Sequence, residues 1–163
     1  MNKDIERIKE NMNILKDCTL CPRNCHADRF GGHRGRCHET AEIVAARAAL
    51  HMWEEPCISG DAGSGAVFFS GCPMGCIFCQ NHNIAEAKAG KIITIEKLSQ
   101  IFLELQGEGA ANINLVTPTH YVPQIIEALE MARKAGLDLP VVYNTSGYEK
   151  PETIQMLDGH VDV

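Results

Sequence analysis

Three cysteines stand close together in the middle of the chain, in the order Cys72-Pro-Met-Gly-Cys76-Ile-Phe-Cys79. Three thiolates at this spacing can hold three corners of a cubane 4Fe-4S cluster, whereas electron-transfer clusters use four protein thiolates. The fourth iron would stay open to the amine and carboxylate of a small molecule. Two alternatives are open: a zinc site with a fourth ligand such as His82, and three thiols that are buried as small apolar groups.

A second group of cysteines has the spacing C-x2-C-x3-C-x11-C and consists of Cys18, Cys21, Cys25 and Cys37. Four thiolates suit a closed site, either structural zinc or an auxiliary iron-sulfur cluster, and spacing alone does not separate the two. Histidines of this segment can substitute for a thiol, at His26, His33 and His38. The remaining cysteine, Cys57, is expected to be a packed free thiol.

Four arginines share the amino-terminal cysteine segment, at Arg23, Arg29, Arg34 and Arg36. They can form a surface for a partner or an electron donor. A solvated charged loop is the commoner explanation of such a group.

Length and charge limit the possible functions. The chain has 163 residues, with 21 acidic against 15 basic side chains and a net charge of -6. This balance argues against a main role in nucleic-acid binding, which requires basic groups that neutralise phosphates. No apolar stretch has the length of a membrane span, and the first residues lack the apolar core of a signal peptide. We therefore expect a cytoplasmic protein, without membrane or nucleic-acid partners, whose cysteines serve metal or redox chemistry.

The amino-terminal part shows little regular patterning. Apolar residues at spacings of three and four predict an amphipathic helix over residues 2–16. Residues 18–39 are rich in Cys, His, Arg and Gly and cannot fold by burying apolar area, so a metal is expected to organise them. Residues 43–53 combine helix-favouring alanines with strand-favouring Ile and Val, and we expect extended structure there.

A βα alternation follows from about residue 65. Short apolar runs predict strands at residues 66–70, 113–116 and 141–143, and residues 161–163 look like the start of a fourth strand. Thr94 is a plausible N-cap for a helix that ends at Gly107. Pro123 opens a second helix, which Gly136 stops, and Pro151 opens a third.

This alternation predicts an α/β fold, because strands separated by amphipathic helices pair in parallel through right-handed crossovers. Either a βα barrel or a doubly wound sheet satisfies it, and both place their chemistry at the carboxyl ends of the strands. The Cys72 loop follows the first such strand. We expect two parts: an amino-terminal helix with a Cys-rich metal-binding segment over residues 1–60, and a βα unit over residues 61–163.

The cysteine array, with Phe78 before its last member, resembles the radical S-adenosylmethionine superfamily. Further motifs resemble a subgroup related to pyruvate formate-lyase activating enzymes: Cys18-Thr-Leu-Cys21-Pro-Arg-Asn-Cys25, Arg34-Gly-Arg-Cys37, Glu54-Glu-Pro56, Phe68-Phe-Ser-Gly-Cys72, Cys79-Gln-Asn81 and Thr117-Pro-Thr-His-Tyr121.

The resemblance implies a partial (βα)6 barrel with a 4Fe-4S cluster on Cys72, Cys76 and Cys79. S-adenosylmethionine would bind the open iron, and its reductive cleavage would give a 5′-deoxyadenosyl radical that abstracts hydrogen. It also implies a reduced flavodoxin- or ferredoxin-like electron donor and a glycyl radical enzyme as partner. Because the cofactor carries the chemistry, no acid, base or nucleophile is expected among the side chains.

The resemblance also suggests contacts to S-adenosylmethionine. Phe78 corresponds to an aromatic near the adenine, although it can equally fill space under the loop. Thr117 begins the stretch that takes the place of the amine-binding Gly-Gly-Glu of many relatives, where a hydroxyl, a backbone carbonyl or His120 can replace it. Asn144 and Ser146 correspond to polar residues that contact the methionine or ribose, and turn formation is their alternative role.

The barrel looks truncated, since the chain stops after about the third βα unit. We expect such a chain to bind its cluster but to hold S-adenosylmethionine weakly, unless a second copy or fragment completes the barrel. The leading hypothesis is thus a radical enzyme or its front part. The alternative is a non-catalytic iron-sulfur or zinc module for electron transfer or protein interaction, and a nucleic-acid binder is a distant third.

Overall fold

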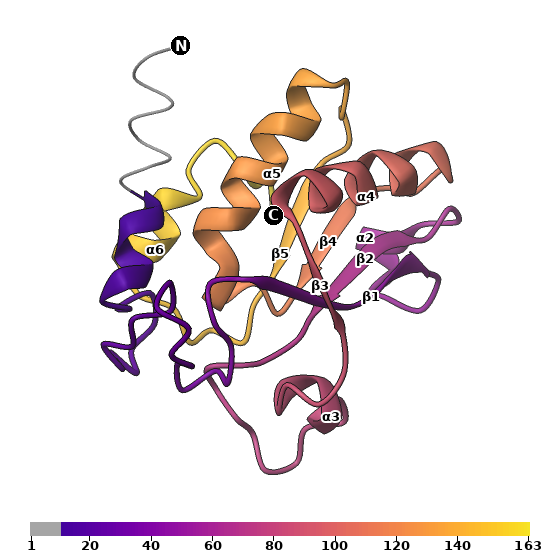
Figure 1. Ribbon diagram of the computed structural model, residues 1–163. Helices are drawn as coiled ribbons and strands as arrows, with labels where there is room; N and C mark the ends of the chain where they lie inside the picture. Colours follow the sequence, from indigo (N-terminus) through magenta and orange to yellow (C-terminus); the bar gives the residue numbers. More distant parts are fainter. Residues whose placement is uncertain (1–10) are drawn as a thin grey trace.

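The computed structural model describes residues 11–163 and contains one mixed sheet with helices on one side (Figure 1). The strand order is β3-β1-β2-β4-β5. The strands are β1 (Ile43–His51), β2 (Ser64–Phe69), β3 (Lys91–Ile93), β4 (Ile113–Val116) and β5 (Val141–Asn144). Strands β2, β4 and β5 are parallel, which confirms the pairing expected from the βα alternation.

Two long helices cover this sheet, α4 (Ile95–Gly107) and α5 (Val122–Lys134). The Thr94 hydroxyl accepts a hydrogen bond from the Lys97 N–H at 3.1 Å, so the predicted N-cap is confirmed. The apolar faces of both helices pack on alternate strand residues in one core, with Leu98, Phe102, Ile125, Leu129, Val67, Phe69, Ile113, Leu115 and Val141 among its members.

The remaining helical elements are short. They are η1 (Ile14–Lys16), α2 (Pro56–Ser59), α3 (His82–Ala85), η2 (Thr119–Tyr121) and α6 (Pro151–Met156). Of the predicted helix over residues 2–16, residues 2–10 lie outside the described part of the chain. Its end packs in a small core of Leu15, Cys18 and Leu20, against which Met156 of α6 also packs.

Strand β1 confirms the extended structure expected for residues 43–53, but its neighbours were not foreseen. It runs antiparallel to both β2 and β3, with a register shift between Ala45 and Arg47 where it pairs with β2. The expected amino-terminal part therefore contributes a strand to the sheet of the second part, and the division at residue 60 stays a prediction.

The last residues continue the parallel pattern without forming an assigned strand. The Val163 N–H donates to the Val141 carbonyl at 3.3 Å, and the Tyr143 N–H donates to the Val163 carbonyl at 2.8 Å. This pair of bonds is one step of a parallel ladder on the free edge of β5. The five strands form an open sheet, and its continuation into a partial barrel stays a prediction.

Candidate metal and cofactor site

The loop after β2 carries the three central cysteines at the carboxyl end of a parallel strand. Cys72, Cys76 and Cys79 are all free thiols and all partly exposed. Gly71 and Gly75 have positive φ angles of 82° and 66°, so glycine permits the turns that fold the loop back. The Cys79 N–H closes the last turn by donating to the Cys76 carbonyl at 3.2 Å.

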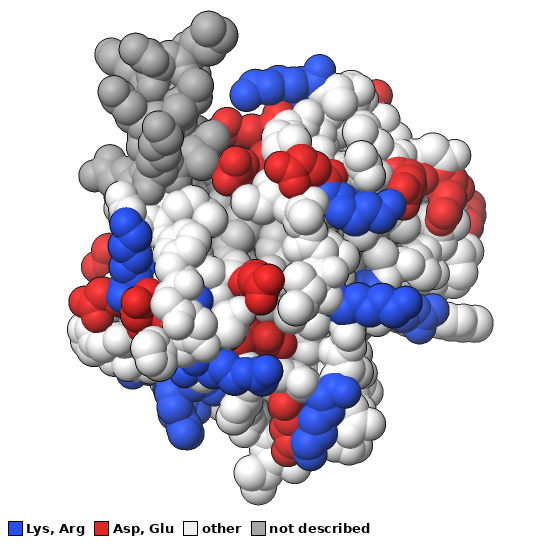
Figure 2. All heavy atoms as spheres, in the orientation of Figure 1, with Lys and Arg blue, Asp and Glu red and all other residues white. Residues whose placement is uncertain are grey.

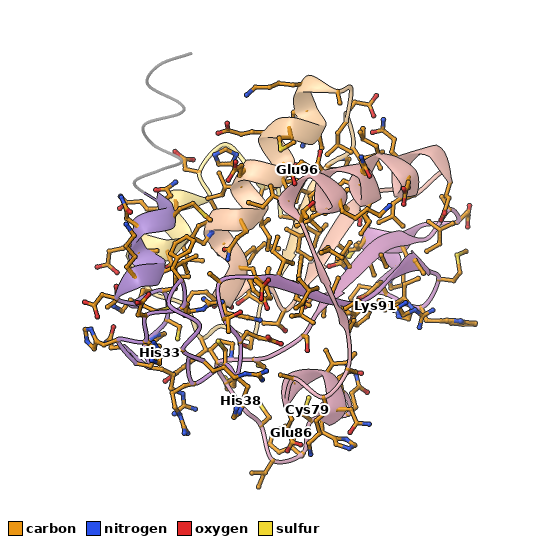
Figure 3. All side chains as sticks on the ribbon, viewed as in Figure 1. His33, His38, Cys79, Glu86, Lys91 and Glu96 are labelled. Carbon is orange, nitrogen blue, oxygen red and sulfur yellow. The ribbon has the colours of Figure 1, made fainter. Side chains whose placement is uncertain are left out.

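All three thiol-bearing residues line one hollow of about 270 Å³. The same hollow is lined by side chains that are basic or can ligate a metal, namely Arg23, Arg36, His38 and His82. Figure 3 shows His38, Cys79 and Glu86 close together at this end of the molecule, and all three border the hollow. Two arginines against one glutamate leave this hollow with an excess of positive charge in a chain of net charge -6.

The donor set fits an iron-sulfur cluster, because thiolates are its ligands and three of them surround one hollow on one loop. Within residues 11–163, no three His, Cys, Asp or Glu side chains converge closely enough to enclose a single metal ion. His82 lies at the same hollow, so three thiols and one imidazole border it, but they do not converge as a single zinc ion requires.

Thr117 lies close to the cysteine loop, as its expected role requires. A smaller hollow of about 70 Å³ separates the carboxyl ends of β2 and β4 from the loop. Cys72 and Cys79 line it on one side, and Val116 and Thr117 on the other. The carboxyl edge of the parallel strands therefore meets the thiols.

The other expected cofactor contacts are less close. Asn144 pairs with Val116 in the β4–β5 register, so it belongs to the same edge, but its side chain lines neither hollow. Ser146 is exposed in the loop after β5. Phe78 is 86% exposed, so it does not fill space under the loop. The roles proposed for these three side chains stay predictions.

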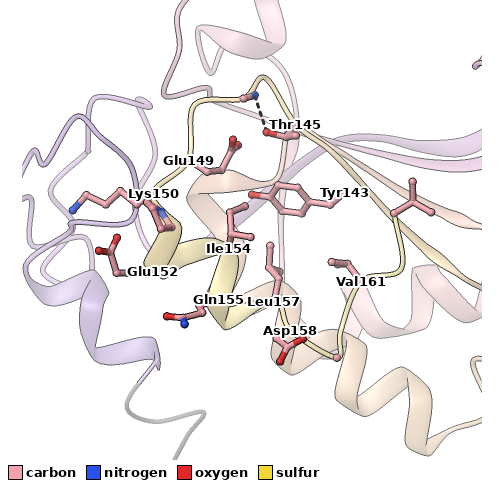
Figure 4. Close-up of a pocket in the computed structure, with 14 residues that line it drawn as sticks. Tyr143, Thr145, Glu149, Lys150, Glu152, Ile154, Gln155, Leu157, Asp158 and Val161 are labelled. Atoms are coloured by element: carbon pink, nitrogen blue, oxygen red, sulfur yellow. Dashed lines mark hydrogen bonds between the residues drawn. The ribbon is translucent and has the colours of Figure 1, made fainter.

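A larger hollow of about 980 Å³ lies between β5 and α6 (Figure 4). Tyr143, Thr145 and Glu149 line it, and the Thr145 hydroxyl accepts a hydrogen bond from the Gly147 N–H at 2.9 Å. This bond is the turn chemistry that the Asn-Thr-Ser-Gly stretch favours in any protein. None of the eight cysteines lines this hollow.

The amino-terminal cysteines lie near one another. Cys18, Cys21 and Cys37 are buried and Cys25 is partly buried. A Cβ on Gly35 would lie 3.3 Å from the Cys37 Sγ and 3.4 Å from the Cys25 Sγ, so both thiols face the same glycine. A second metal at these cysteines stays a prediction.

Burial and backbone donors act on these thiols in opposite directions. Burial raises the pKa of Cys37 to about 11 and also raises the pKa of Cys21. Burial also acts to raise the pKa of Cys25, but N–H donors of Ala27 and Arg36 outweigh it and hold that pKa below its ordinary value. Such N–H groups around a thiolate favour its charged, metal-binding form.

For Arg29, the interpretation of the arginines as a partner surface or a solvated loop is wrong. It is 1% exposed, and its guanidinium donates to the Thr40 carbonyl at 2.6 and 3.1 Å and to the His120 carbonyl at 2.6 Å. The guanidinium also lies 5.5 Å from the centre of the Tyr121 ring. It thus holds the cysteine segment against the loop between β4 and α5.

His120 lies beneath the start of the cysteine loop. Its Nε2 is 2.6 Å from the Ser70 carbonyl, which only accepts, so Nε2 carries the proton. Burial, assisted by the Arg29 charge, lowers the pKa of His120 to about 3, so the ring is neutral. From the sequence, His120 was one of three groups proposed to contact the amine of S-adenosylmethionine. The structure makes it a buried support for the residue that precedes Gly71.

Together these features describe a class: an α/β protein with three free thiols at the carboxyl edge of parallel strands. The sequence profile described as Radical SAM superfamily matches residues 66–162, more than half of the chain. The chain therefore belongs to the radical SAM superfamily. That membership implies a 4Fe-4S cluster and S-adenosylmethionine, and the activating-enzyme subgroup stays a prediction.

The chain is also similar to a curated protein of Methanocaldococcus jannaschii that is described as uncharacterized protein MJ0674. The two sequences are 29% identical over an alignment of 178 positions, which covers 98% of this chain and 50% of the relative. The chain thus spans about half the length of the curated relative it matches. No solved structure matches the chain. Within residues 11–163, no helix has both the length and the apolar character needed to cross a bilayer.

Proposed function

We propose that the chain is a radical SAM iron-sulfur protein that binds a 4Fe-4S cluster through Cys72, Cys76 and Cys79. The observation that carries this proposal is the position of the three free thiols. They lie on one loop, around one hollow, directly after the first parallel strand. Superfamily membership supports the same cofactor.

Cys72, Cys76 and Cys79 would hold a cluster that offers an open iron to the amino and carboxylate groups of S-adenosylmethionine and, when reduced, the electron that cleaves its sulfonium. One electron and S-adenosylmethionine would give methionine and a 5′-deoxyadenosyl radical. This radical would take a hydrogen atom from the substrate to give 5′-deoxyadenosine and a substrate radical. The proposed electron source is a reduced flavodoxin- or ferredoxin-like protein.

The residues of this chain have binding roles in the proposal. Thr117, beside the loop, is proposed to contact S-adenosylmethionine, and its place at the hollow shared with Cys72 and Cys79 supports this. Asn144 at the same edge and Ser146 in the next loop are proposed to contact the methionine or ribose. Phe78 is proposed to cover the adenine, and its exposed ring is free to do so.

The finer identity is also a proposal. We propose a cytoplasmic oxidoreductase of the pyruvate formate-lyase activating type, whose substrate is the glycine of a glycyl radical enzyme. The proposed architecture is a partial βα barrel, of which this chain forms the front part. A second metal, zinc or iron-sulfur, would occupy Cys18, Cys21, Cys25 and Cys37, three of which are buried.

Metal analysis tests the proposed cluster. After anaerobic reconstitution we expect about four irons per chain from the Cys72 loop, with any further metal at the amino-terminal cysteines. Cys57 lies outside both groups and is exposed, so the expectation that it is packed is wrong. Cys72→Ala should lose those irons, whereas Cys57→Ala should keep them. Zinc in place of iron, or iron that survives Cys72→Ala, would instead support the metal-binding module.

The second metal is tested separately with Cys37→Ser. If the amino-terminal thiols hold a metal, this variant loses it and keeps the irons that depend on Cys72. A closed four-thiolate site contributes folding free energy, so the melting temperature should fall as well. Unchanged metal content and unchanged melting would show that these cysteines are packed thiols.

A further inference from the structure

Arg23 joins the two cysteine groups through its side chain. Its Nε donates to the Pro73 carbonyl at 2.9 Å, and its Nη2 donates to the Met74 carbonyl at 2.9 Å. Both carbonyls belong to the stretch between Cys72 and Cys76. A guanidinium presents its donors in a rigid planar fork, so it can bind two adjacent carbonyls at once and fix the path of the backbone between them.

The arginine is itself held at both ends. Its guanidinium lies 5.3 Å from the centre of the Tyr148 ring, in the loop after β5. The neighbouring Asn24 N–H donates to the Cys21 carbonyl at 3.1 Å and closes a turn that contains Arg23. The side chain therefore starts from a turn of the amino-terminal cysteines and ends on the central cysteine loop.

The loop has limited support of its own. Gly75 has a positive φ, and the side chains of Ile77 and Phe78 project almost fully into solvent. Figure 2 shows both basic and acidic side chains over the lower part of the face it draws, where Figure 1 places the amino-terminal segment and the α3 region. External hydrogen bonds are therefore expected to set the shape of this loop.

We propose that Arg23 is a positioning residue: from the amino-terminal cysteine segment it fixes the backbone of the Cys72–Cys79 loop, so that this segment controls how firmly the loop holds its cluster. The proposal deepens the proposed function and rests on it for the identity of the bound group. Arg23 also places a positive charge at the hollow, where it favours the more negative, reduced form of a thiolate-bound cluster.

Hydrogen exchange of the full chain tests the positioning role without any cluster. In metal-free protein, Arg23→Gln should accelerate exchange of the amides of residues 74–80 by about tenfold while α5 is unchanged, since the loop opens locally. Arg36→Gln is the matched control, because Arg36 lines the same hollow and has no side-chain hydrogen bond to the loop among the described residues. Equal exchange in Arg23→Gln and wild type would overturn the proposal.

Cluster binding tests the consequence. Removal of outer-shell partners of metal sites typically costs about 10- to 100-fold in affinity, so Arg23→Gln should lose iron to a chelator at least about tenfold faster than Arg36→Gln. In Arg23→Lys the midpoint potential of the bound cluster should equal that of the wild type, because lysine keeps the positive charge. Iron should still be lost faster to the chelator, because an ammonium lacks the planar fork of the guanidinium. Equal chelator loss in both glutamine variants would contradict the proposal.

These readouts separate the two claims. If the wild-type chain takes up no iron, the proposed function fails, and the exchange comparison still decides whether Arg23 fixes the loop. If iron binds but Arg23→Gln changes neither exchange nor retention, the proposed function stands and the role of Arg23 is refuted.

Discussion

The backbone N–H of Cys72 donates to the carbonyl of Cys37 at 3.2 Å. The first cysteine of the central loop is therefore in direct contact with the last cysteine of the amino-terminal group. The contact exists because Gly71 lets the chain pass close by. A Cβ at Gly71 would lie 2.5 Å from the Cys37 carbonyl oxygen and 2.5 Å from the Glu39 Cγ. The two cysteine groups are therefore parts of one packed region.

Gly71→Ala should separate these two segments. Alanine is strained at a positive φ of 82°, and its Cβ would also clash with the backbone of Cys37. We therefore expect the free energy of unfolding to fall by about 3 kcal/mol. Gly109→Ala is the control, because its φ of 87° is similar and its Cβ would meet open space, so about 1 kcal/mol is expected. Urea unfolding measures both, and equal losses would contradict the close contact.

Replacement of Arg29 should loosen the amino-terminal segment. Arg29→Met leaves the buried carbonyl of His120 and the partly buried carbonyl of Thr40 without their donor, which predicts a loss of about 2 to 4 kcal/mol. Arg34→Met removes one exposed hydrogen bond to the His38 carbonyl and should change stability by less than about 0.5 kcal/mol. Arg29→Lys should not rescue, since an ammonium lacks the planar fork. The same stability for Arg29→Met and Arg34→Met would refute this role.

The regular elements could be predicted where local signals agree. Thr94 and Gly107 bracket α4, and the apolar run of residues 113–116 is β4, because capping, turn residues and periodicity all act within a few positions. The antiparallel placement of β1 beside β2 could not be predicted, since it depends on a pairing partner about twenty residues away and on a register shift inside the strand.

Of the candidate site, the sequence could predict that the three central cysteines lie on one loop after a strand. Their spacing and their position after a strand identify the loop, because ligand chemistry needs few residues at fixed distances. Arg29 could not be recognised as buried, because nothing in its Gly-rich neighbourhood separates it from the exposed Arg34. Arg23 could not be linked to Pro73, since the contact joins two irregular loops.

His120 gives the stability a pH dependence of known sign. Its pKa is lowered from 6.5 to about 3 by burial, so below pH 6.5 the unfolded chain takes up a proton that the folded chain refuses. This contribution is fully present above pH 6.5 and is lost as the pH falls toward 3. Between pH 7 and pH 5 the expected loss is about 2 kcal/mol.

His120→Gln checks this contribution, because glutamine can donate to the Ser70 carbonyl but does not titrate. Urea unfolding at pH 7 and pH 5 should show a larger loss for the wild type than for the variant. Glu39, whose pKa burial raises, acts in the opposite direction, and it cancels when the two proteins are compared. Equal losses in both proteins would show that the pKa of His120 is the same in the folded and the unfolded chain.

The most direct measurement is the release of 5′-deoxyadenosine by the anaerobically reconstituted, reduced chain in a large excess of S-adenosylmethionine. The proposed three-thiolate site predicts that 5′-deoxyadenosine appears only with reductant. It should be abolished by Cys76→Ala and retained by Cys57→Ala. A wild-type chain that carries about four irons on the Cys72 loop and still releases none would contradict the proposed radical chemistry.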